Sequence, residues 1–270
     1  MHNSFSKNGR TGYAPTMSRH PLKRHVQQEL PKTRKRDKND QFRGGKRPGA
    51  GRPKKLGRSP EPHTVRPPLK ASTPVHVVLR VNSDVGSLRS HEGFAAVREA
   101  RLSTLRLDDS FRLIHFSIQK NHIHLIVEAH NRDALSTGMQ VFAISCAKQL
   151  NAAISAHRGK RRRGSVFTDR YYARSLKTPR EVRNCLAYVL NNWRHHKVDR
   201  DRMRDPWKVD PFSSALAFDG WKERPEGKRF KIPPDYEGSW IWLPRTWLMT
   251  TGWRRYGLVS IYEVPGRGDE

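Results

Sequence analysis

The chain has 270 residues, of which 35% are hydrophobic, and its formal charge at neutral pH is +28. Such a charge predicts a polyanionic partner, with nucleic acid as the first candidate. The two cysteines, Cys146 and Cys185, are too few and too widely spaced for a disulfide framework or a paired-cysteine zinc site, so we expect a reducing, cytoplasmic compartment. No stretch approaches the ~20 apolar residues of a membrane span, so we expect no membrane partner.

Residues 1–72 predict a basic arm that is disordered until DNA binds, because they hold three aromatic residues and no sustained periodicity. Within the arm, residues 44–55, GGKRPGAGRPKK, resemble the AT-hook, which lies in the minor groove of A·T-rich DNA. The match is incomplete, since Ala50 stands where an AT-hook has its first arginine, and a solvated linker that contacts phosphates is the alternative. The candidate DNA-binding residues of this segment are Arg47, Arg52, Lys54 and Lys55.

Four elements are predicted after the arm. Residues 73–82, TPVHVVLRVN, alternate β-branched residues with others and predict a strand. Residues 92–105 have apolar residues at helical spacing and predict a helix. Residues 111–119 and 122–129 predict two further strands, and the two residues between them, 120–121, have the spacing of a hairpin turn.

Three more elements complete a domain over residues 73–198. Residues 133–157 are rich in helix formers, residues 165–177 predict an edge strand, and residues 178–196 predict a helix. The start of that last helix is encoded by an N-cap, a proline and an acidic residue, namely Thr178, Pro179 and Glu181. The order of elements predicts an α+β fold, an antiparallel sheet with helices packed on one face in a ferredoxin-like or RRM-like form.

Residues 199–270 predict an irregular C-terminal extension rich in proline and tryptophan. The extension either folds back onto the domain with its tryptophans as apolar anchors, which we favour, or presents them as a surface on which bases stack. Six of the seven tryptophans belong to it: Trp207, Trp221, Trp240, Trp242, Trp247 and Trp253.

Two histidines flank Ile123 in the predicted strand 122–129. Because successive side chains of a strand point to opposite faces, His122 and His124 share a face and lie roughly 7 Å apart, close enough for one ion. Two unrelated surface histidines are the alternative. Glu128 shares that face, either as a group behind the ion or as a solvated edge residue.

Tyr188 and Asn192 are four residues apart in the predicted helix 178–196, so they would share one helix face. That face borders the apolar stripe that must pack on the sheet, which would place a tyrosine over the histidine pair; ordinary packing is the alternative. The stripe consists of Val182, Cys185, Leu186, Val189, Leu190 and Trp193.

Together these motifs resemble the single-tyrosine transposases of HUH type (IS200-like), most of all their REP-associated branch. The tripeptide His-Ile-His at 122–124, preceded by Asn121, matches the HUH motif. Tyr188 matches the nucleophile, and Asn192 matches a polar metal ligand four residues later. The chain departs from the branch at Trp193, where the branch has a proline.

The resemblance covers residues 73–198 and implies an HUH nuclease fold and an enzyme that nicks and joins DNA. It implies that Tyr188 forms a 5′-phosphotyrosine and that His122, His124 and Asn192 bind a divalent metal. Such enzymes use Mg²⁺ or Mn²⁺, whereas two imidazoles and an amide by themselves favour Zn, Ni or Mn over Mg.

The resemblance also implies single-stranded or hairpin DNA as the substrate, bound by a monomer or a homodimer in the bacterial cytoplasm at the nucleoid. A phosphate inside a duplex is poorly placed for a tyrosine on a helix at a sheet edge. The basic residues that we expect to follow the DNA backbone are Lys160, Arg161, Arg162, Arg163, Arg170 and Arg174.

Several alternatives remain open. A DNA-binding protein of the same fold without catalysis is disfavoured because all four motif residues remain. A zinc nucleobase deaminase needs His-x-Glu and Pro-Cys-x-x-Cys, which are absent, and residues 111–119 lack the aromatic strand motif of RNA-binding modules. Tyr171 and Tyr172 are rival nucleophiles, but adjacent strand residues point oppositely, so at most one can reach the ion.

Overall fold

The computed structural model describes residues 61, 64–196, 209–223, 230 and 241–265. The AT-hook-like segment and its four basic residues lie outside the described residues. Contacts divide the chain into residues 1–55 and residues 56–270, and the architecture below concerns the second unit only.

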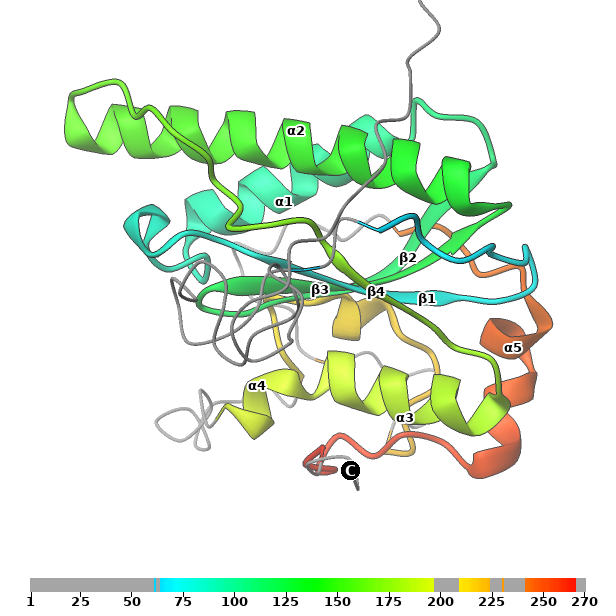
Figure 1. Ribbon diagram of the computed structural model, residues 1–270. Helices are drawn as coiled ribbons and strands as arrows, with labels where there is room; N and C mark the ends of the chain where they lie inside the picture. The colour runs from blue at the N-terminus through cyan, green and yellow to red at the C-terminus, as the bar shows by residue number, and fades with distance from the viewer. Residues whose placement is uncertain (1–60, 62–63, 197–208, 224–229, 231–240, 266–270) are drawn as a thin grey trace, which may run out of the picture. The chain divides into compact units, whose positions relative to one another are not determined.

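A four-stranded antiparallel sheet forms the centre of this unit (Figure 1), with the strand order β2-β3-β1-β4. Its strands are β1 (Val75–Arg80), β2 (Phe111–Ile118), β3 (His122–Ala129) and β4 (Tyr172–Ser175). The predicted hairpin joins β2 to β3, and the amide of Gln119 donates to the carbonyl of His122 across it at 2.8 Å. The predicted α+β class with an antiparallel sheet is therefore confirmed.

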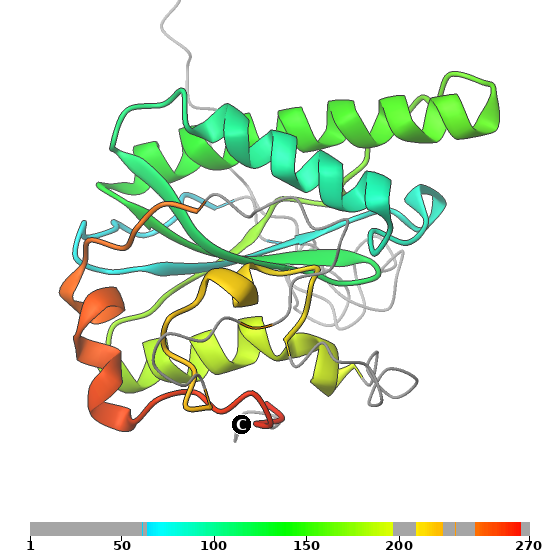
Figure 2. The same cartoon turned by 180° about the vertical axis from the view of Figure 1, so that it is seen from behind.

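Two long helices cover one face of the sheet: α1 (His91–Thr104) and α2 (Arg132–Arg158), as Figures 1 and 2 show. The alternate residues of β3 that point to this face, Ile123, Leu125 and Val127, are fully buried in the core beneath them. Gly138 lets α2 approach the sheet closely, because a Cβ there would lie 2.1 Å from the ring of Phe111.

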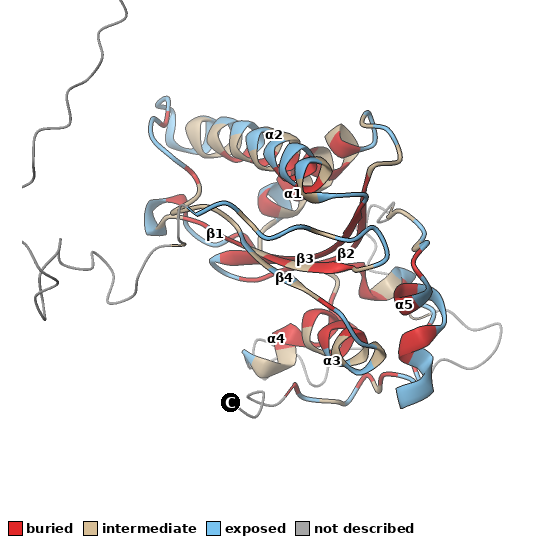
Figure 3. Cartoon of the chain, turned by 45° about the vertical axis from the view of Figure 1, so that its right-hand side comes forward, coloured by how far each residue is buried: buried red, intermediate tan, exposed pale blue. Residues whose placement is uncertain are grey.

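A second core covers the opposite face, where α3 (Pro179–Leu190) packs. The expectation of helices on one face only is therefore corrected. The physical reason is that β2 and β3 are buried on both faces, as Figure 3 shows along their whole length. Ile114 and Ile126 point away from α1 and α2 and join the apolar stripe of α3, so this face also requires cover.

The capping box predicted for α3 is present: the amide of Glu181 donates to Thr178, and the Glu181 carboxylate accepts from the Thr178 amide. The helix stops at Leu190 rather than continuing to residue 196, and a short helix, α4 (Asn192–His195), follows. At the junction, Asn191 leaves helical geometry and its side-chain amide donates to the carbonyl of Ser260 at 2.9 Å. Tyr188 and Asn192 therefore do not share one continuous helix, which corrects that expectation.

The described part of the C-terminal extension packs into the second core. Trp221 and Trp253 are each 1% exposed, and their indole N–H groups donate to the carbonyls of Ala215 and Met249. The packing interpretation is confirmed for these two tryptophans, whereas Trp247 is about half exposed.

Short helices complete the unit: η1 (Ser83–Val85), η3 (Ser214–Ala217), α5 (Trp247–Thr250) and η4 (Gly252–Tyr256). None of the helices in the described ranges is long and apolar enough to span a membrane.

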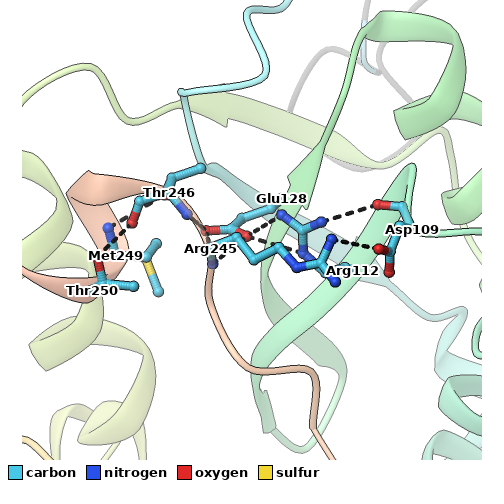
Figure 4. A network of polar contacts seen from close by, with 7 residues as sticks. All are labelled: Asp109, Arg112, Glu128, Arg245, Thr246, Met249 and Thr250. Carbon is cyan, nitrogen blue, oxygen red and sulfur yellow. Dashed lines mark hydrogen bonds and ion pairs between the residues drawn. The ribbon is translucent and has the colours of Figure 1, made fainter.

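Glu128 fastens the extension to the sheet (Figure 4). It is 1% exposed, and Nη2 of Arg112 donates to it at 2.7 Å. The backbone amide of Arg245 and both the amide and hydroxyl of Thr246 donate to the same carboxylate. Glu128 is therefore neither a solvated edge residue nor a group behind the ion, because all these donors hold it between β2 and the start of α5.

Candidate active site

The two histidines of β3 face the second core. Strand alternation puts them on the same side as Ile126, as expected, and both are nearly buried: His122 is 7% exposed and His124 is 3% exposed. Their ring centroids lie 4.7 Å apart, with the ring planes almost perpendicular at 85°. The two imidazole rings therefore lie next to each other on the sheet face that α3 covers.

Tyr188 reaches this pair from α3. Its ring lies 5.2 Å from the ring of His124, edge to face at 85°. The position follows from the helix pattern, because Tyr188 borders the buried stripe that packs on the sheet. The structure thus brings Tyr188, His122 and His124 into one cavity, which all three side chains line.

A contact with Asn121 fixes the orientation of His122. The side-chain oxygen Oδ1 of Asn121 lies 2.7 Å from Nδ1 of His122. Because an amide oxygen only accepts hydrogen bonds, Nδ1 carries the proton in this contact, and Nε2 of a neutral ring then has a lone pair. An imidazole binds a metal ion through such a lone pair.

Burial keeps both imidazoles neutral. It lowers the pKa of His122 to about 4, with smaller contributions from Arg80 and His196. Burial also holds the pKa of His124 well below 6.5, reinforced by its histidine neighbours His76 and His122. Since a ligand imidazole must be deprotonated, the pair is ready for a cation at neutral pH.

Asn192 is fully buried at the start of α4, and neither of its side-chain amide atoms has a hydrogen-bond partner among the described residues. It is not among the residues that line the cavity. His196, which sequence reasoning did not single out, lines the cavity, and its ring lies 5.5 Å from that of His122.

The donor atoms fit a divalent cation. Nε2 of His124, like the amide of Asn192, is buried without a partner in the described part of the chain, and an orphaned polar atom at such a depth is costly unless a ligand satisfies it. Within the described ranges, no group of three or more His, Cys, Asp or Glu side chains is arranged to hold a metal. His122 and His124 line the cavity, and Asn192 stays a predicted third ligand.

The cavity has a volume of about 1510 Å³ and a mixed lining, in which five lysine and arginine side chains stand beside four carboxylates: Glu61, Asp169, Glu181 and Glu263. The predicted DNA-binding residues Arg170 and Arg174 line it, and Arg174 also pairs with Glu181 at 3.2 Å. Three further basic side chains line it that sequence reasoning did not single out: Arg80, Lys120 and Arg180. Their convergence depends on the strand register and on how α3 packs on the sheet, and neither was readable from the sequence.

The basic loop after α2 does not reach the cavity. Lys160, Arg161 and Arg163 are exposed there but do not line it. Arg162 is 8% exposed and donates to Asp84 at 2.7 Å, as well as to an asparagine and two backbone carbonyls. The prediction that Arg162 contacts DNA is therefore corrected, because these bonds use it to fold the loop back onto the chain.

The two alternative nucleophiles, Tyr171 and Tyr172, point to opposite faces of the sheet, as strand alternation predicts. Tyr172 pairs with Val78, lines the cavity and is 43% exposed. Tyr171 packs against the first core, with the guanidinium of Arg66 4.1 Å from its ring centre. Tyr172 is therefore the rival nucleophile within reach of the cavity.

The comparisons with known proteins identify the class. The family model described as "Transposase IS200 like" matches residues 71–192, from just before β1 to Asn192. Residues 71–192 thus match the family that the sequence motifs predicted. A solved structure titled "Structure of the REP associates tyrosine transposase bound to a REP hairpin" is similar at 18% identity, over 50% of this chain and 74% of that chain, with a TM-score of 0.38. No curated protein matches the chain. The family supports a transposase-type, DNA-processing function.

Proposed function

We propose that this chain cuts and rejoins single-stranded or hairpin DNA through a covalent 5′-phosphotyrosine on Tyr188. The observation that carries the proposal is the approach of the Tyr188 ring to 5.2 Å from the His124 ring, inside a cavity with basic side chains. A nucleophile, a pair of metal-binding imidazoles and a polyanion-binding surface are the parts that phosphodiester cleavage needs.

His122 and His124, with Asn192 as the third donor, would hold the divalent cation, Mg²⁺ or Mn²⁺ as in the family. When bound, such an ion supplies Lewis-acid polarisation of a phosphoryl oxygen and neutralises its charge. The chain's own part is to present neutral imidazoles, which burial secures by lowering the pKa of His122 to about 4.

Tyr188 would attack the phosphorus of a phosphodiester with Oη. A bond forms between Oη and phosphorus, the bond from phosphorus to the 3′ oxygen breaks, and that oxygen leaves as a 3′-hydroxyl after taking up a proton. The tyrosine gives up its own proton, so the numbers of protons balance. Attack of a 3′-hydroxyl on the phosphotyrosine reverses the step and rejoins DNA without ATP.

The basic side chains of the cavity would orient the DNA strand. Arg174, on β4, is opposite His76, whereas Arg80, at the end of β1, is opposite His122, so basic side chains lie toward both ends of the histidine pair along the sheet. Arg170 and Lys120 also line the cavity. Contacts from such residues to phosphates supply affinity independent of base sequence and make binding salt-dependent.

Incubation of labelled hairpin and single-stranded DNA with Mn²⁺ or Mg²⁺, followed by denaturing electrophoresis, tests the proposal. The wild type gives a covalent adduct, Tyr188→Phe gives none, and the matched control Tyr172→Phe keeps it. An adduct that survives Tyr188→Phe and disappears in Tyr172→Phe would move the nucleophile to β4. DNA binding without cleavage under either metal would favour a non-catalytic DNA-binding protein of this fold.

A further inference from the structure

A third histidine, His76 on β1, lies on the same face of the sheet as the histidine pair. In the register of β1 and β3, His76 is opposite Ile126 and Val78 is opposite His124, so His76 and His124 are diagonal neighbours. Nε2 of His76 lies 3.1 Å from Nδ1 of His124. Sequence reasoning missed His76 because the offset between β1 and β3 is a property of the pairing.

The rings of His76 and His124 meet edge to edge. The ring planes differ by 19°, and the ring centroids lie 5.2 Å apart. This centroid distance is longer than the 3.1 Å between the two nitrogens by about the width of one imidazole ring. Both nitrogens therefore lie close to the line between the ring centres. This geometry directs the lone pair of one nitrogen at the N–H of the other, as a hydrogen bond requires.

Which of the two rings carries the shared proton determines what His124 can bind. A neutral imidazole has one N–H and one lone pair. If Nδ1 of His124 carries the proton, its Nε2 presents a lone pair, whereas donation from Nε2 of His76 leaves an N–H on Nε2 of His124. That atom is buried without a hydrogen-bond partner among the described residues. A lone pair there is satisfied by a cation, but an N–H would stay unpaired and block the cation.

We propose that His76 is a positioning residue that accepts the Nδ1–H of His124 and so holds Nε2 of His124 available as a metal ligand. The inference rests on the proposed function, since it assigns His76 a role toward that metal. Asn121 makes the matching contact with His122 at 2.7 Å. Both histidines thus have Nδ1 held by a protein acceptor, which is how proteins orient imidazole ligands.

The first test needs no metal. In the full chain labelled with ¹⁵N-histidine, NMR of the wild type shows His124 protonated at Nδ1. His76→Phe keeps a ring but removes the acceptor, so the fraction of His124 protonated at Nε2 rises. His76→Gln offers an amide oxygen in place of the imidazole and restores the wild-type tautomer. His157→Gln, an exposed position on α2, is the matched control and changes nothing.

The second test measures Mn²⁺ affinity by calorimetry, with thermal unfolding to establish that each variant is folded. His76→Phe weakens Mn²⁺ binding about 10- to 100-fold, and His76→Gln recovers most of the loss. An unchanged His124 tautomer in folded His76→Phe, or equal Mn²⁺ affinity in wild type and His76→Phe, overturns the role of His76 alone. A wild type that binds no Mn²⁺ overturns the proposed metal-dependent function, and with it the metal-directed role.

Discussion

His124 and Tyr188 come from opposite sides of one packing interface: the strand supplies the imidazole, and the helix that covers the strand supplies the phenol at a ring distance of 5.2 Å. The second core that holds α3 on the sheet is therefore also what sets the distance between the proposed metal site and the proposed nucleophile. The effects of substitutions in this core and of substitutions at the site can be distinguished by measuring the free energy of unfolding and the cleavage of DNA separately.

Asn192→Ala is expected to weaken Mn²⁺ binding about 10- to 100-fold while changing the free energy of unfolding of the metal-free protein by no more than about 1 kcal/mol. The reason is that the Asn192 amide is fully buried without a partner in the described chain, so its removal breaks no internal bond. Calorimetry with Mn²⁺ and urea unfolding without it measure both quantities.

His196→Ala is the matched control, because His196 lines the cavity and lies 5.5 Å from His122 but is exposed. It is expected to leave Mn²⁺ affinity close to that of the wild type. The opposite pattern, with loss in His196→Ala and none in Asn192→Ala, would show that an imidazole from the end of α4 is the third ligand.

The sequence was sufficient for the type and order of the main strands and helices, though not for where α3 and β4 begin or end, and for placing His122 and His124 on one face, because strand alternation and helix capping are local. It also predicted that Tyr188 borders the buried stripe of α3. It did not predict that helices cover both faces of the sheet, since Ile114 and Ile126 reveal a second buried face only once both strand faces are compared.

Contacts between residues that are distant in the sequence could not be predicted from local sequence patterns. Asn191 ends α3 through a bond to Ser260, and His76 reaches His124 only through the β1–β3 register. Arg162 looked like a surface cation because its neighbours are basic, yet Asp84, far earlier in the chain, pairs with it. Each of these three outcomes is set by tertiary contact rather than by composition.

Glu128→Gln is expected to destabilise the protein by about 3–5 kcal/mol, because it leaves the guanidinium of Arg112 buried without its counter-charge. Both side chains are nearly inaccessible, at 6% for Arg112 and 0% for Glu128. Urea unfolding measures the loss. Glu99→Gln removes a partly exposed ion pair with Arg98 and is expected to cost less than about 1 kcal/mol. Equal effects of the two substitutions would contradict the anchoring role of Glu128.

His115 makes stability pH-dependent. It is 5% exposed on β2, and burial lowers its pKa to about 4, against an unfolded value of about 6.5. Below pH 6.5 the unfolded chain binds the proton first, so His115 removes stability as the pH falls from about 6.5 to about 4, by about 3 kcal/mol in total. His115→Gln, which can still bond to Ser214, is expected to reduce the acid-induced loss by that amount.

The measurement for His115 is urea unfolding at a series of pH values between 4 and 7. His157→Gln is the control, since this histidine is exposed on α2, and its profile is expected to follow the wild type. Other buried histidines contribute in the same window but are common to all three proteins. Parallel profiles for His115→Gln and wild type would mean that the pKa of His115 is the same in the folded and unfolded states.

Arg170→Ala is expected to weaken the binding of single-stranded DNA and to reduce the slope of log affinity against log salt by about 0.7, the value for one phosphate contact on a single strand. Arg170 lines the cavity, whereas Lys160 lies exposed in the loop after α2 and does not. Lys160→Ala therefore serves as the charge-matched control and should keep the wild-type slope. Fluorescence anisotropy of a labelled oligonucleotide at several salt concentrations gives both slopes, and a larger change in Lys160→Ala than in Arg170→Ala would place the DNA strand outside the cavity.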